Sequence, residues 1–134
     1  MHTKAEAMAV RLGTDFEDPS TALGLANVAV HRLAALVRLG DGPAALDYAQ
    51  TIDAQLWGRL PRERRANYLL DLAEAHRQCG NIPEAIDALW QADLTAPQEV
   101  RNRPLGRDLI IRLKESDAAS PQLRQLAAHA GIAE

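Results

Sequence analysis

Two side chains that could do covalent chemistry, His76 and Cys79, lie three positions apart in the stretch HRQCG. On a helix this spacing places an imidazole beside a thiol, which is the arrangement of a cysteine nucleophile and its base. The alternative, which we favour, is a packed histidine beside a thiol at the end of a helix. The histidines at positions 2, 31, 76 and 129 do not have the spacing of a zinc site, and Cys79 is the single cysteine.

Other signatures of catalysis are missing from the sequence. It contains no glycine-rich phosphate loop, no G-x-S-x-G motif and no H-E-x-x-H motif. We therefore expect a protein that is not an enzyme and that uses no cofactor and no metal ion.

The charge cluster RERR, residues 62–65, opens a predicted helix, where positive charge opposes the helix dipole. The cluster is therefore a candidate site for an anion or a partner, although a solvated helix face is the explanation we favour. The net charge of the chain is only −3, so electrostatic attraction favours neither DNA nor acidic membranes.

The composition indicates a single helical domain. The 134 residues are 47% apolar, with leucine and alanine dominant, and only 4% aromatic, which favours helices over sheets. The N-terminus lacks the apolar segment of a signal peptide, and no apolar run is long enough to span a bilayer. Together with the lone cysteine, which suits a reducing compartment, this predicts a cytoplasmic protein.

Two stretches of the chain repeat one pattern, LGDGPAALDYAQ at residues 39–50 and CGNIPEAIDALW at residues 79–90. In each, a glycine follows a helical stretch and can take the left-handed conformation that ends a helix. A polar residue and then a proline follow, as at the start of a helix. In the second stretch, Asn81 and Glu84 predict a capping box. Each stretch therefore predicts a helix, a tight turn and a second helix.

Apolar residues at helical spacing predict which faces of these helices pack. Before the second turn, the predicted buried stripe consists of Leu69, Leu72, Ala73 and His76. Leu70 lies outside this stripe. After the turn the helix is apolar on two sides, so we expect it to lie between neighbouring helices. Its two stripes are Ala85, Ala88, Leu89 and Ala92, and beside them Ile86 and Trp90.

Residues 66–99 resemble one 34-residue tetratricopeptide (TPR) repeat, and residues 26–59 resemble a less faithful copy. The matching positions in the better copy are Leu72, Ala73, His76, Gly80, Asn81, Ala85, Leu89, Ala92 and Pro97. The spacing between the two turns exceeds the length of one such repeat by about six residues, which predicts a longer loop near residues 54–63. A third helical pair is expected in the last part of the chain, its second helix starting at Ser120 and ending at Gly131.

The resemblance implies an all-α fold, a TPR-like α-solenoid of antiparallel helix pairs with about six to seven helices. We expect one domain spanning residues 1–134. Its expected parts are a remnant helix and loop at 1–19, repeats at 20–59 and 60–99, and a third helical pair at 100–134.

Roughly residues 8–132 are also similar to the C-terminal half of actinobacterial XRE-type helix-turn-helix regulators. The similar segments include NVAVHRLAALVRLGD, LPRERRANYLLDLAEAHRQCGN and PLGRDLIIRL. In those regulators a short DNA-binding domain precedes a TPR-like sensory region. No segment here has the pattern of that DNA-binding domain. We therefore expect a piece of a longer regulator, a separately encoded half or a stand-alone relative.

In TPR proteins, the second, fifth, ninth and twelfth positions of each first helix contact the ligand in a concave groove. Carried over to this sequence, these positions imply the candidates Asn27, Asn67, Leu70, Glu74, Arg77, Arg101 and Asp108. His31 is a further candidate, because the similar regulators commonly carry histidine at that position. Asn27, Asn67 and Arg101 would form a polar ladder suited to a peptide backbone or a carboxylate. Leu70 would line an apolar pocket. The alternatives are ordinary exposed residues and, for His31, a buried structural histidine.

The resemblance thus implies a sensory or oligomerisation domain of a transcription regulator. Such a domain would bind a protein, a peptide or a small effector and would form a homodimer. It would reach DNA only through a separate or missing helix-turn-helix domain, and it would not contact a membrane. The alternative is a stand-alone TPR adaptor for protein–protein interaction, with no link to DNA.

Overall fold

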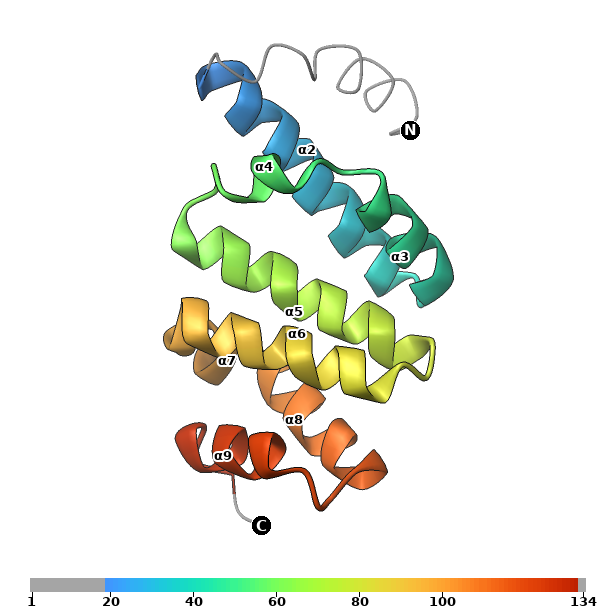
Figure 1. Ribbon diagram of the computed structural model, residues 1–134, viewed down its shortest axis with the longest axis vertical. Helices are drawn as coiled ribbons and strands as arrows, with labels where there is room; N and C mark the ends of the chain where they lie inside the picture. The colour runs from blue at the N-terminus through green and yellow to red at the C-terminus, as the bar shows by residue number, and fades with distance from the viewer. Residues whose placement is uncertain (1–18, 133–134) are drawn as a thin grey trace.

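The computed structural model describes residues 19–132, and every regular element in this range is helical (Figure 1). The helices are α2 (Pro19–Arg38), α3 (Gly42–Gln50), α4 (Ala54–Trp57), α5 (Arg62–Gln78), α6 (Ile82–Thr95), α7 (Pro97–Asn102), α8 (Pro104–Ser116) and α9 (Pro121–His129). The all-α prediction is therefore confirmed. None of the described helices is long and apolar enough to cross a membrane. The remnant helix expected before residue 19 lies outside the described residues.

The two predicted glycine turns have the same geometry. Gly40 and Gly80 have φ angles of 77° and 76°, in the left-handed region that favours glycine. The amide of the residue after each glycine donates to the carbonyl five residues earlier, at 3.0 Å after Gly40 and at 2.9 Å after Gly80. These are the hydrogen bonds of a Schellman motif. Equivalent turns therefore join α2 to α3 and α5 to α6.

The helices that follow these turns begin differently. The carboxylate of Asp41 accepts a hydrogen bond from the amide of Ala44 at 3.2 Å, as expected for a cap. Asn81 makes no side-chain cap bond, because its amide lies 3.3 Å from Nδ1 of His76 instead. The predicted capping box is therefore wrong. Ser120 caps α9, as predicted.

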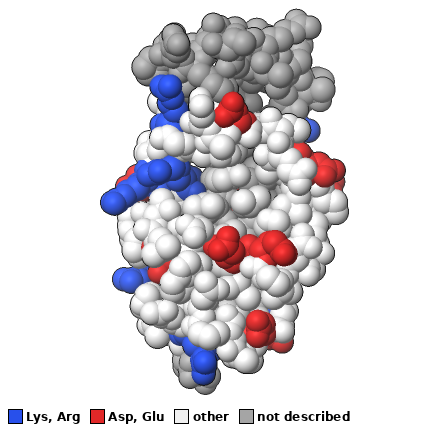
Figure 2. Space-filling model, in the orientation of Figure 1, with Lys and Arg blue, Asp and Glu red and all other residues white. Residues whose placement is uncertain are grey.

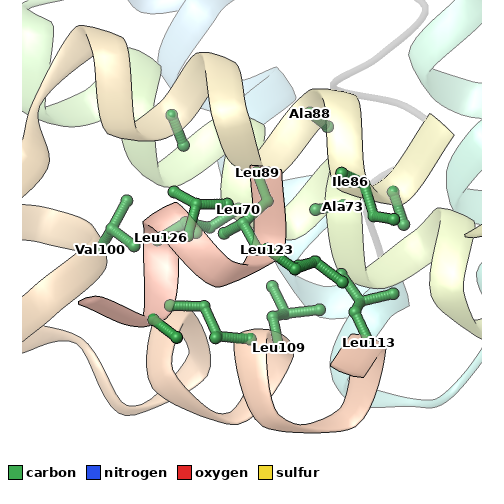
Figure 3. Packing of buried hydrophobic residues seen from close by; sticks show 14 residues of the cluster. Leu70, Ala73, Ile86, Ala88, Leu89, Val100, Leu109, Leu113, Leu123 and Leu126 are labelled. Carbon is green, nitrogen blue, oxygen red and sulfur yellow. The ribbon is translucent and has the colours of Figure 1, made fainter. Parts of the chain in front are cut away.

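The helix α5 is the central element of the fold. Figure 1 shows α2 and α3 at one end of the molecule, α5 and α6 in the middle, and α7, α8 and α9 at the other end. α5 contacts α2 and α3 on one side and α6, α7 and α8 on the other. An apolar cluster fills the space between α5, α6, α8 and α9 (Figure 3). Its largest fully buried members are Leu70, Leu89, Leu109, Ile110, Leu113, Leu123, Leu126 and Val100.

The segment predicted as a loop near residues 54–63 contains the short helix α4, which packs on α2. Leu56 and Leu60 are buried against the first half of α2. Trp57 stacks on Tyr68 of α5, with the ring centroids 3.6 Å apart. Stacked aromatic pairs add about 0.5–1.5 kcal/mol to the energy of burial. The segment is therefore held against both α2 and α5.

The region after α6 is divided into two helices, α7 and α8. Arg103 has an extended conformation and Pro104 follows it, which ends one helix and starts the next. Gly106, in the first turn of α8, lies so close to the backbone of Val100 in α7 that a Cβ atom there would clash. Arg101 and Asp108, which the TPR register places on one helix, consequently lie on two.

Candidate binding groove

Polar side chains follow one face of α5, and we call this set the α5 polar stripe. Its members are Arg64, Asn67, Asp71, Glu74 and Gln78, at the spacing of residues that share a helix face. The stripe is hydrogen-bonded to α2 at one side and to α7 and the α7–α8 junction at the other. Its polar atoms therefore connect helices within the molecule.

Asn67, a member of the predicted polar ladder, links α5 to the C-terminal helices. Its side-chain amide donates to the carboxylate of Glu99 in α7 at 2.7 Å, and its side-chain oxygen accepts from Arg103 at 3.0 Å. Asn27 of α2 likewise accepts a hydrogen bond from an arginine of α5. Arg101 is exposed on α7. Two of the three ladder residues are thus engaged in contacts between helices.

Glu74 and Arg77, two further candidates, form an ion pair within α5. The guanidinium of Arg77 donates to both carboxylate oxygens of Glu74, at 2.6 and 2.8 Å, and Gln78 donates to one of them at 3.0 Å. Burial acts to raise the pKa of Glu74, but these hydrogen bonds lower it below its usual value. Gln78 also donates to the carbonyl of Val37 in α2 at 3.1 Å, so this group ties the end of α5 to α2.

Asp71 is the most buried charged residue of the stripe, at 4% exposure, and the sequence analysis did not single it out. Its carboxylate accepts a hydrogen bond from Arg103 at 3.1 Å. Burial raises the pKa of Asp71 above its usual value, and the charge of Arg103 only partly offsets this. The spacing of Asn67, Asp71 and Glu74, which repeats at four and three residues, is the sequence signal that could have revealed the stripe.

Leu70 does not line a ligand pocket, contrary to the prediction. It is 0% exposed and lies in the core with residues of α6, α8 and α9 (Figure 3). Leu69, Leu72 and His76, which were predicted to be packed, are only half-buried. The pattern misplaced the buried face because α5 is apolar on two adjacent sides and has helices around most of its circumference.

These half-buried residues form the floor of an open groove along α6, which we call the α6 groove. It has a volume of about 390 Å³ and is lined by Leu69, Leu72, His76, Pro83, Glu84, Asp87, Ala88 and Gln91. Leu69 and Leu72 also pack with apolar residues of α3, so α3 lies beside the floor. The exposed carboxylates of Glu84 and Asp87 form an acidic edge.

The two helices beside the groove floor, α3 and α6, carry charge of one sign. α3 and α6 contain no lysine or arginine, and their charged residues are Asp47, Glu84, Asp87 and Asp93. Burial lowers the pKa of His76 below its usual value, against the opposing effect of Glu84, so its ring is neutral at neutral pH. Figure 2 shows acidic side chains near the middle of the face that it draws, with basic side chains mainly toward the margins.

The remaining candidates lie outside this groove. His31 on α2 and Asp108 on α8 are both exposed. The cluster RERR at 62–65 opens α5, as predicted, and Cys79 is a half-buried free thiol at the end of that helix. Among residues 19–132, no group of three His, Cys, Asp or Glu side chains is arranged to hold a metal ion.

Comparison with known proteins gives no match: no family model, no curated protein and no solved structure is significantly similar to this chain. The resemblances to TPR repeats and to helix-turn-helix regulators therefore rest on the residues named above.

Proposed function

We propose that this chain is a TPR-like α-solenoid that binds a protein or peptide segment and does not catalyse a reaction. The equivalent turns at Gly40 and Gly80, and the contacts of α2 with α5 and of α5 with α8, support the solenoid. The observation that carries the binding function is the α6 groove, which is open and has an apolar floor beside charged groups. A groove that places apolar and charged side chains next to each other suits an amphipathic segment of a partner.

We further propose that the domain is the sensory or oligomerisation region of a transcription regulator. In this role it acts in the cytoplasm as a homodimer and reaches DNA through a separate helix-turn-helix domain. The similarity over roughly residues 8–132 to actinobacterial regulators supports this role. A stand-alone TPR adaptor is the second candidate, because the same groove would serve it equally well and only the partner would differ.

Capture of a partner tests this function. The purified chain is immobilised, proteins retained from the source cell are identified by mass spectrometry, and each is purified for calorimetry. A dissociation constant in the micromolar range or below, for a partner that carries a helix-turn-helix domain, supports the regulator. The same affinity for a partner without that domain favours the adaptor. If no retained protein binds when purified, the binding function is wrong.

A further inference from the structure

We propose that the α6 groove takes a partner segment that is both apolar and basic, namely an amphipathic helix with Lys or Arg beside its apolar side chains. This inference rests on the proposed binding function and names the class of partner. It is carried by the residues that line the groove and by the distribution of charge over the helices.

The floor of the groove determines the apolar part of the partner. Leu69 and Leu72 are half-buried and present apolar surface beside Ala88. The lining runs along α6 from Pro83 to Gln91, which is about 12 Å of helix axis. A groove of this length fits about two turns of a helix, with apolar side chains at three- and four-residue spacing.

The edge of the groove determines the charge of the partner. Glu84 and Asp87 lie three residues apart on α6, and within residues 19–132 no ion pair involves either carboxylate. Since α3 and α6 have no lysine or arginine, no cation on these helices neutralises them. A basic segment would supply the missing charges, and an acidic segment would be repelled.

The rest of the molecule directs such a partner to this side. Helices α2, α5 and α8 carry most of the arginine and lysine residues of the chain. By contrast, α3 and α6 carry only acidic charged residues, so they attract a basic segment, and this attraction weakens as the salt concentration rises.

Two synthetic peptides test the proposal. The first is an amphipathic peptide of Leu and Lys at helical spacing, and the second has Glu in place of every Lys. With a fluorescent label on each peptide, anisotropy at low and at physiological salt measures binding to the folded chain. We expect saturable binding of the Leu/Lys peptide, weaker at the higher salt, and no binding of the Leu/Glu peptide.

Matched variants locate the binding site. Glu84→Gln combined with Asp87→Asn should weaken binding of the Leu/Lys peptide by about tenfold, and Gln91→Lys should weaken it by adding a positive charge at the groove. The control, Glu115→Gln combined with Asp117→Asn at the end of α8, removes the same charge away from the groove and should change binding by less than about twofold. Circular dichroism checks that every variant is folded.

The proposal is overturned by equal binding of the two peptides, by no binding of the Leu/Lys peptide, or by equal weakening in the groove and control variants. A captured partner that binds the groove variants as tightly as the original chain would also overturn it, while leaving the binding function in place. If neither a captured protein nor a peptide binds, both proposals fail.

Discussion

The guanidinium of Arg103, at the junction of α7 and α8, lies 3.1 Å from the carboxylate of Asp71 in α5. The same guanidinium donates to the side chain of Asn67 at 3.0 Å. The almost fully buried carboxylate of Asp71 in α5 is therefore paired with a cation from the α7–α8 junction. Because the side chain of Arg103 is 28% exposed, solvent screens this pair, and breaking it costs less than breaking a pair in the deep interior.

Arg103→Gln should lower the free energy of unfolding by about 1–3 kcal/mol, since the carboxylate of Asp71 stays buried without its charged partner. Urea denaturation followed by circular dichroism measures the change. Arg101→Gln removes an exposed arginine of α7 and should change the free energy by less than about 0.5 kcal/mol. Equal losses in the two variants would contradict a specific role for Arg103.

Gly106→Ala should destabilise the protein by about 1–3 kcal/mol, because the added methyl group forces α8 away from the backbone of Val100. The matched control is Gly24→Ala in α2, where an added Cβ has no described neighbour within 4 Å. That substitution should raise stability by about 0.5–1 kcal/mol, since alanine loses less backbone entropy in a helix. Thermal unfolding measures both, and changes of the same sign would argue against the close approach of α7 and α8.

Leu70→Ala should cost about 2–5 kcal/mol of unfolding free energy, because it leaves a cavity in the core. Leu94, on α6, is 64% exposed, so Leu94→Ala should cost less than about 0.5 kcal/mol. Chemical denaturation of both variants distinguishes a core residue from one that lines a surface pocket. A small loss for Leu70→Ala would restore the original ligand assignment of this side chain.

Tyr68 should make the protein less stable in strong alkali. Burial raises the pKa of Tyr68 from 10.0 to about 12. The unfolded chain therefore loses this proton first, and the free energy of unfolding falls as the pH rises from about 10 to about 12. Tyr68→Phe should remove this part of the pH dependence.

Tyrosinate absorbance checks the assignment directly. In Tyr48→Phe, Tyr68 is the remaining one of the two tyrosines, so the absorbance should titrate with a midpoint near 12. A midpoint near the ordinary value of about 10 would show that its hydroxyl is not desolvated.

The helices and their turns could be predicted because local residues determine them. At Gly40 and Gly80 the left-handed backbone depends on glycine itself, and the caps at Asp41 and Ser120 depend on residues three positions away. Asn81 is the exception, because a nearby histidine binds the side chain that would otherwise cap the helix.

The buried faces and polar contacts could not be predicted in the same way. Helical spacing shows that α5 has an apolar face, but the neighbouring helices determine that Leu70 is buried and that Leu69 borders a groove. The partners of Asp71 and Asn67 come from the α7–α8 region, 32 residues further along the chain. The sequence shows that these residues are polar but does not show what they contact, because their partners depend on how the helices pack.

The two tryptophans lie in different parts of the interior, and this makes each an optical reporter. Trp57 packs with the apolar clusters of the N-terminal half, whereas Trp90 packs against the C-terminal cluster. The fluorescence of a variant that keeps only one tryptophan therefore reports the unfolding of one half of the molecule. Coinciding curves from the two single-indole proteins would reveal a single cooperative unit, and separated curves would reveal halves that melt in turn.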